Sequence, residues 1–172
     1  MNILPESFYA RDTVTVARDL LGKLLVHGDR IGRIVEVEAY LGLHDKAAHA
    51  SRGITPRTRV AFGPPGRAYV YLIYGLHECL NVVTEPEGTP GCVLLRALSP
   101  VANVTGPLNG PGRLTKAMGI TRLHYGHEFF RDPLTIRDAP PPSEPILTTP
   151  RIGISQCQDW PLRFVLGSAV LP

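Results

Sequence analysis

The residues best suited to chemistry are two glutamates, Glu36 and Glu38, two positions apart in a strand-like segment. Residues 33–41 alternate apolar and polar side chains, which is typical of a half-buried strand, and Tyr40 follows the glutamates on the same face. The strand rise puts the two carboxylates about 7 Å apart. Because buried carboxylates are costly unless paired, this is either a solvent-facing strand or a site where a carboxylate handles water or a proton. Arg96, in an apolar run, is expected to pair with one of them or to point into a pocket.

Three tyrosines within six residues are the second feature, in the strand-like segment 68–74. Unpaired bases stack on aromatic faces and gain about 1–3 kcal/mol each, so Tyr69, Tyr71 and Tyr74 suit the binding of an extruded base. The alternative is a core strand whose tyrosine hydroxyls reach the surface. A strict strand places Tyr71 and Tyr74 on opposite faces, so both serve one site only if the chain bends near residues 73–75.

The net charge is only +3, but the cations gather where acids are missing. Residues 46–77 and 88–127 contain no Asp or Glu. If the two stretches fold together, they form a basic face that suits a polyanion such as nucleic acid. The alternative is chance clustering. The cations concerned are Lys46, Arg52, Arg57, Arg59, Arg67, Arg96, Arg113, Lys116 and Arg122.

Two segments inside these stretches are candidates for contact with a phosphate backbone. The loop at residues 55–59 would place the guanidiniums of Arg57 and Arg59 beside phosphates; the alternative is a solvated loop. Farther along, Gly112 and Arg113 open a short helix that continues past Lys116. The free amides at that helix N-terminus would bind a phosphate.

Short helices and strands must position these groups. The sequence predicts a helix from Asp12 or Thr13 to Gly22, a single helical turn within 44–50 and a helix over 110–119. It predicts strands over 23–26, 33–41, 68–74, 80–84, 92–98, 151–155 and 162–166, with a hairpin joining the first two. Residues 52–66, 101–111 and the proline-rich segment 139–150 are expected to be loops.

The composition is that of a globular domain, with 172 residues, 44% apolar and 19% charged. This length predicts one domain with a sizeable core. No run approaches 18 apolar residues, so no membrane span is expected, and the N-terminus shows no secretion signal. Cys79, Cys92 and Cys157 form neither a CxxC motif nor a disulfide framework. We therefore expect a cytoplasmic protein, and a monomer, since no coiled coil is evident.

Six motifs in order resemble the alkyladenine (3-methyladenine) DNA glycosylase family, over nearly the whole chain. The resemblance implies an α+β fold, with residues 1–172 forming a single DNA glycosylase domain around a curved, mostly antiparallel sheet. It also implies base-excision repair: the enzyme flips an alkylated or deaminated purine out of double-stranded DNA and hydrolyses its N-glycosidic bond. The product is an abasic site, no cofactor or metal takes part, and the bacterial nucleoid is the place of action. The motifs span residues 33–42, 47–49, 69–75, 79–81, 93–98 and 161–164.

Site roles carry over from the family position by position. Glu38 matches the family's water-activating carboxylate, and Tyr40, His49 and Tyr71 match the residues that hold the flipped base. A cationic, alkylated purine would gain from such electron-rich rings. Glu36, if near and charged, would tend to raise the pKa of Glu38.

Other matches concern the DNA around the flipped base. Tyr74 matches the side chain that fills the gap left in the duplex, and Asn81 matches the residue that screens against the exocyclic amine of guanine. Arg96 matches a residue near the flipped nucleotide, and Arg113 with its glycine-rich helix start looks like part of the phosphate grip. The chain departs from the family at residues 101–111, which form a shorter segment than usual, and at His77, where a larger aromatic is common.

Several other functions were compatible with the residues. A metal site could be built from His44, Asp45 and His49, although mixed ligands without cysteine are a weak signal. An O-glycosidase could use Glu36 and Glu38, but sugars need no cationic face. A lyase would need an amine, and the three lysines, at positions 23, 46 and 116, lie outside the site motifs, which predicts simple hydrolysis. A non-catalytic damaged-DNA-binding module is the alternative from another class. The choice among lesions stays open.

Overall fold

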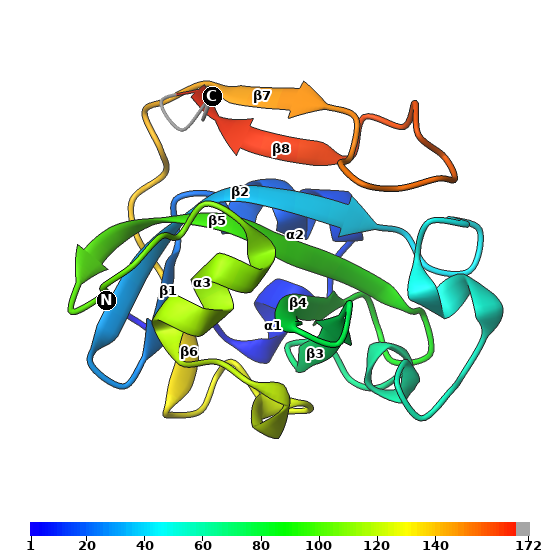
Figure 1. Ribbon diagram of the computed structural model, residues 1–172, viewed down its shortest axis with the longest axis horizontal. Coiled ribbons are helices and arrows are strands. Elements are labelled where there is room, and N and C mark those ends of the chain that lie inside the picture. The colour runs from blue at the N-terminus through cyan, green and yellow to red at the C-terminus, as the bar shows by residue number, and fades with distance from the viewer. Residues whose placement is uncertain (168–172) are drawn as a thin grey trace.

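An eight-stranded antiparallel sheet forms the centre of the computed structural model, which describes residues 1–167 (Figure 1). The main path of the sheet has the strand order β3-β4-β5-β2-β1-β6; β8 also pairs with β2, and β7 pairs with β8. Short helices surround it, so the α+β fold with a curved antiparallel sheet is confirmed. The strands are β1 (Leu24–His27), β2 (Arg30–Tyr40), β3 (Ala68–Ile73), β4 (His77–Thr84), β5 (Gly91–Ala102), β6 (Leu134–Arg137), β7 (Ile146–Thr149) and β8 (Arg163–Leu166).

Three α-helices and three 3₁₀-helices accompany the sheet in the described part of the chain. They are α1 (Glu6–Tyr9), α2 (Thr13–Leu20), α3 (Pro111–Met118), η1 (His49–Arg52), η2 (Arg59–Phe62) and η3 (Arg122–His124). Asp12 caps α2, as predicted, since its carboxylate accepts from the Thr15 amide at 3.0 Å. Helix α2 contacts β2 and β5, and α3 contacts β4 and β5. Both helices therefore bury their apolar faces against the strands that carry the candidate site.

Strand β2 is central to the sheet, because it pairs with three other strands. It pairs with β5 along one edge, and along the other with β1 near its start and β8 near its end. Val35, Val37 and Ala39 are buried, as the alternating pattern predicted, but the strand is not half-buried, because Ile34, Glu36 and Glu38 are buried as well. The register with β5 is interrupted around Glu36. Such irregular pairing often re-aims a side chain beside a site, and here it lies next to both glutamates.

The chain bends directly after β3. This is the bend that Tyr71 and Tyr74 need if both are to serve one site. Strand β3 ends at Ile73, and Tyr74 and Gly75 have φ of 53° and 66°. This left-handed conformation suits glycine but is uncommon for tyrosine. The bend leaves Tyr74 86% exposed at the tip of the β3–β4 hairpin, while Tyr71 stays in the strand.

Two predictions near the C-terminus are wrong. The segment 139–150 is not all loop: β7 occupies the four residues between Pro145 and Pro150 and pairs with β8. Proline is tolerated beside a short edge strand, so the density of prolines was misleading. Residues 151–155, predicted as a strand, are irregular. Here the Arg151 side chain and the Ile152 amide bond to buried carboxylates instead of a neighbouring strand.

Smaller differences concern where elements begin and end. The predicted loop 101–111 begins later, because β5 continues through Ala102. The helical turn expected within 44–50 is the 3₁₀-helix at residues 49–52, and a second one, η2, interrupts the predicted loop 52–66. Within residues 1–167, no helix combines the length and apolar character needed to cross a bilayer. Residues 168–172 of the expected single domain lie outside the described part.

Candidate active site

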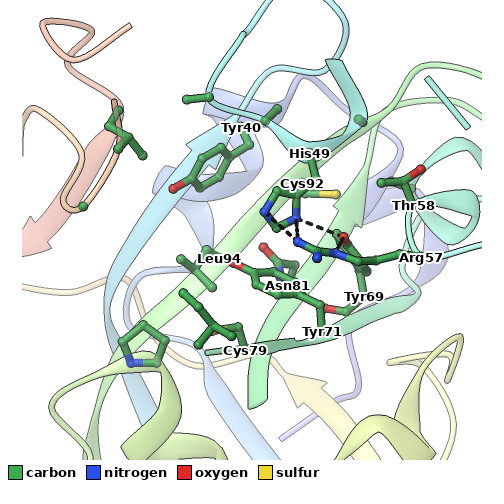
Figure 2. Close-up of a pocket in the computed structure, with 18 of the residues that line it drawn as sticks. Tyr40, His49, Arg57, Thr58, Tyr69, Tyr71, Cys79, Asn81, Cys92 and Leu94 are labelled. Carbon is green, nitrogen blue, oxygen red and sulfur yellow. Dashed lines mark hydrogen bonds between the residues drawn. The ribbon is translucent and has the colours of Figure 1, made fainter. Parts of the chain in front are cut away.

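A cavity of about 950 Å³ opens beside the C-terminal end of β2. Its walls come from the loop that follows β2, from β3, β4 and β5, from the start of α3 and from the irregular segment 152–156. Figure 2 shows Tyr40, His49, Tyr69 and Tyr71 around this space. Tyr40 ends β2, His49 begins η1, and the other two tyrosines belong to β3. The sheet thus gathers the aromatic residues predicted from sequence into one pocket.

Glu38 lies directly behind the cavity wall and is fully buried. One carboxylate oxygen accepts from the Ile152 amide at 2.7 Å. The other accepts from the Tyr40 hydroxyl at 3.0 Å and from the Arg96 guanidinium at 3.4 Å. All three donors line the cavity, so the carboxylate is within one hydrogen bond of the space where a substrate would sit.

The surroundings of Glu38 act on its pKa in opposing directions. Burial raises the pKa above its ordinary value and is the largest effect. The positive charge of Arg96, the Ile152 amide and the Tyr40 hydroxyl lower it, while Glu36 raises it slightly, in the predicted direction. A carboxylate whose pKa is raised, yet which is held by three donors, is suited to accept a proton from water.

Glu36 is held by two arginines on the same side of the sheet. Its carboxylate accepts from Arg96 Nε at 3.1 Å and from Arg163 Nε at 2.7 Å. Glu36 does not line the cavity, and among the described residues that do, there is no Asp or Glu. Because Glu36 is bonded to two arginines, it is not available as the second carboxyl group that the O-glycosidase alternative needs beside Glu38. Arg96 satisfies both expectations: it pairs with the glutamates and it reaches the pocket.

Aromatic rings form the walls of the cavity. The rings of His49 and Tyr71 meet edge to face with centroids 4.6 Å apart, and Tyr69 lies 5.3 Å from Tyr71. Removal from water, together with the charges of Arg57 and Arg52, lowers the pKa of His49 to about 4. His49 is therefore neutral at physiological pH, and its ring presents a hydrogen-bonding edge without adding positive charge.

Two further predicted residues border the same space. Asn81 is buried and lines the cavity, where its side-chain amide donates to the Tyr69 carbonyl at 3.1 Å. Tyr74 lies on the lining at the exposed hairpin tip. The structure thus brings together the predicted residues Glu38, Tyr40, His49, Tyr71, Tyr74, Asn81 and Arg96.

Arg57 was predicted to contact the phosphate backbone of DNA, but its side chain lies against the aromatic residues of the cavity. One terminal nitrogen of its guanidinium is 3.0 Å from each ring nitrogen of His49. Its Nε donates to the Tyr69 hydroxyl at 3.4 Å, and its guanidinium carbon stands 5.0 Å from the centre of the Tyr71 ring. Figure 2 shows this side chain reaching between His49 and Tyr69.

The remaining predicted backbone contacts lie at or beyond the rim. Gly112 and Arg113 line the cavity at the start of α3, and Arg113 donates to the Asn109 side chain at 3.2 Å. Lys116 and Arg59 are exposed and are not among the lining residues. Gly112 meets a steric requirement as well, because a Cβ there would lie 2.8 Å from Cβ of His77.

Sequence reasoning missed several contacts of the site, although it considered Asp45 as a metal ligand. Asp45 and Arg151 form a fully buried ion pair, with distances of 2.5 and 2.9 Å, and the guanidinium lies 4.7 Å from the centre of the Tyr40 ring. Arg163 could have been found as a second arginine in an apolar strand, near two glutamates that need partners. The Ile152 amide has no sequence signal, because it is a backbone group.

The same ion pair bears on the metal alternative. Because Asp45 bonds to Arg151 and His49 contacts Tyr69, the two do not converge on one point. In residues 1–167, no group of three or more His, Cys, Asp or Glu side chains is placed to hold a metal ion. Lys46 lies outside the sequence motifs of the site, but the structure places it on the cavity lining.

Comparison with known proteins gives one family. The model of the family described as methylpurine-DNA glycosylase (MPG) matches residues 7–169. A protein of Anaeromyxobacter dehalogenans (strain 2CP-1), named "Putative 3-methyladenine DNA glycosylase", is 54% identical over 95% of this chain and 81% of its own length. Proteins of the same name from Legionella pneumophila (strain Lens) and Methanoculleus marisnigri are 51% and 52% identical. The alignments cover 96% and 95% of this chain, and 95% and 94% of those proteins.

Proposed function

The chain belongs to the methylpurine-DNA glycosylase family, and from this premise we propose that it excises damaged purines from double-stranded DNA by simple hydrolysis. The damaged nucleotide leaves the base stack and its base enters the cavity. Water activated by Glu38 attacks the sugar and leaves an abasic site. We propose that residues 1–172 act as one domain, as a monomer, on DNA of the nucleoid.

The observation that carries this proposal is a buried carboxylate directly behind an aromatic cavity. Cavities of about 300–1,000 Å³ are typical of small-molecule sites, so a volume of about 950 Å³ has room for a purine and its sugar. Tyr40 and Tyr71 offer faces on which an extruded base can stack. We propose that the base binds with its bond to the sugar facing the part of the wall behind which Glu38 lies.

The proposed reaction balances as a hydrolysis. The water oxygen bonds to the sugar C1′, and the pair of electrons of the C1′–N bond leaves with the base. Glu38 accepts one water proton and later returns it to solvent. An alkylated cationic purine departs as a neutral molecule, which makes it a good leaving group, whereas a neutral purine such as hypoxanthine departs as an anion and takes up a proton from solvent. Arg96 would hold Glu38 and Glu36 in place through the hydrogen bonds described above.

The DNA itself would be held by groups around the cavity mouth. Removing a base from the stack costs a few kcal/mol, and we propose that Tyr74 offsets part of this cost by filling the gap. Asn81 would exclude guanine by meeting its exocyclic amine. Arg59, Arg113 and Lys116 would contact the backbone together with the free amides that begin at Gly112 in α3.

Simple hydrolysis predicts that no covalent intermediate forms with the protein. Lys46 is the one lysine on the cavity lining of the described residues. Borohydride trapping during base release should therefore give no protein–DNA adduct. An adduct that disappears in Lys46→Ala would contradict the monofunctional reaction and identify the amine.

The test of function is direct detection of the released base. Duplex DNA carrying one hypoxanthine or one alkylated adenine is incubated with excess protein, and the free base and the abasic strand are both measured. Release of base from at least one lesion supports the glycosylase. Tight, salt-dependent binding of damaged duplex with no release on any lesion would instead favour a damaged-DNA-binding module.

A further inference from the structure

We propose that Arg57 sets the charge preference of the base pocket and disfavours cationic purines relative to neutral purines of the same shape. This inference rests on the proposed function, because it takes the cavity to be the site that receives a base. It assigns Arg57 a role in specificity, instead of the backbone contact expected from sequence.

The geometry places the Arg57 guanidinium against aromatic rings that line the space a base would enter. It stands 5.0 Å from the centre of the Tyr71 ring and 3.0 Å from both ring nitrogens of His49. Its Nε also bonds to Tyr69. A guanidinium is a planar cation that stacks on aromatic rings. In the free protein Arg57 therefore contacts the same aromatic rings that would favour an alkylated, positively charged purine.

The charge of Arg57 has no acidic partner in the pocket. Among the described residues, none that lines the cavity is Asp or Glu, and the chain has no acid between residues 46 and 77. Glu36 and Glu38 lie nearby, but Arg96 and Arg163 already pair with them. The positive charge of Arg57 is therefore left to act on whatever enters the cavity.

An incoming base meets this cation in one of two ways. A cationic purine must either share the pocket with a like charge or displace the guanidinium from Tyr71, His49 and Tyr69. A neutral purine can keep Arg57 in place, because its ring nitrogens and carbonyl oxygens accept hydrogen bonds from guanidinium N–H groups. The cost falls on the cationic base alone, so Arg57 separates bases by charge.

A matched pair of ligands isolates that charge. 3-Methyladenine in DNA is cationic, and its 3-deaza analogue replaces one ring nitrogen by carbon, which removes the charge and keeps the shape. Both nucleotides carry a 2′-fluoro sugar, which resists hydrolysis, so that the two duplexes differ in the charge of the base. Equilibrium binding of the two duplexes is measured for wild type, Arg57→Gln, Arg57→Lys and Arg59→Gln. Arg59 is the control because it belongs to the same loop but does not line the cavity.

We expect Arg57→Gln to shift the ratio of the two affinities about tenfold toward the cationic duplex, equivalent to about 1.4 kcal/mol. Arg57→Lys keeps the charge and should stay within threefold of the wild-type ratio. Arg59→Gln should weaken both duplexes by the same factor. A change of less than twofold in the ratio for Arg57→Gln would overturn the proposal and would favour the alternative role, in which Arg57 contacts the phosphate backbone.

The glycosylase proposal fails in a different way. If wild type releases no base from any hydrolysable lesion, the enzyme assignment is lost, but the ratio of affinities still decides the role of Arg57. If base is released and the ratio is insensitive to Arg57→Gln, the enzyme assignment stands and the charge preference is refuted.

Discussion

At the scale of single residues, Glu38 combines complete burial with three hydrogen-bond donors within 3.4 Å. Burial favours the protonated acid, whereas the donors favour the carboxylate that a general base must be. Among the donors, Arg96 contributes the largest lowering of the pKa. The protonation state of Glu38 at working pH therefore depends on one arginine more than on any other neighbour.

This dependence predicts the pH profile of an Arg96→Gln variant. Loss of the positive charge raises the pKa of Glu38 further, so a higher pH is needed to ionise it. The acid limb of the single-turnover rate of base release should move to higher pH. Arg163→Gln is the matched control, since Arg163 bonds to Glu36 and not to Glu38, and it should move the limb less. An equal shift in both variants would contradict the specific role of Arg96.

Glu38 should also limit the stability of the fold. Its pKa in the folded protein lies above the ordinary value of 4.5, so ionising it costs folding free energy, and stability falls as pH rises through that interval. Glu38→Gln removes this loss, while Arg96 keeps its bond to Glu36. The thermal midpoint of Glu38→Gln at pH 7 should equal or exceed that of wild type. A drop of about 3 °C or more, roughly 1 kcal/mol for a domain of this size, would contradict the direction of the pKa shift.

At the scale of elements, the buried Asp45–Arg151 pair joins the loop after β2 to the irregular segment after β7. Burial alone would raise the pKa of Asp45, but Arg151 and the amides of Leu41 and Ala47 lower it overall. Next to Arg151, the Ile152 amide bonds to Glu38. The ion pair thus holds in place a loop whose backbone amide, at Ile152, bonds to the Glu38 carboxylate.

Breaking that pair should damage both stability and activity. Asp45→Asn leaves a buried guanidinium with no opposite charge, which typically costs about 3–5 kcal/mol. Urea unfolding measures the loss. The double variant Asp45→Leu with Arg151→Met removes both charges and should recover part of the stability. Base release should stay low in both variants, because the Ile152 segment is no longer anchored. Full activity in the double variant would show that the pair has no positioning role.

The elements also show how far sequence reasoning reaches. The period-two pattern of residues 33–41 gave the strand, its buried face and the shared face of Glu36 and Glu38, because alternation is a local property. The sequence did not predict the bend at Tyr74; it showed only that a bend is needed if Tyr71 and Tyr74 share one site. The strand β7 and the irregular segment 151–155 were predicted the other way round. Their conformations depend on pairing with β8 and on buried carboxylates far away in sequence, which local patterns do not encode.

At the scale of the whole molecule, parts of the two acid-free stretches meet at one cavity. Residues of both line it, including Lys46, Arg52 and Arg57 from the first stretch and Arg96 and Arg113 from the second. The colours of Figure 1 show that the segment after β2 and the start of α3 come from distant parts of the chain. The net charge is only +3, but the charges are unevenly distributed, and the described residues that line the cavity form a cationic surface without any acid. The direction of the Arg57 side chain within it could not be predicted from composition.

This surface predicts a specific salt dependence. Arg113→Gln should weaken the binding of damaged and undamaged duplex alike, and it should lower the slope of log affinity against log salt by about 1. Arg131→Gln is the control, because Arg131 is exposed, pairs with Glu128 and does not line the cavity. Fluorescence anisotropy at several salt concentrations measures both slopes. Equal slopes for Arg113→Gln and wild type would remove Arg113 from the backbone contacts.

The most direct measurement of the central claim compares Glu38→Gln with Glu36→Gln in single-turnover base release from one lesion duplex. A positioned general base contributes about 10²–10⁴-fold, so Glu38→Gln should slow release by at least that much while binding of an abasic-site analogue persists. Glu36→Gln, whose carboxylate only pairs with arginines, should stay within about tenfold of wild type. If Glu38→Gln releases base as fast as wild type, or if Glu36→Gln shows the larger loss, Glu38 is not the group that activates water.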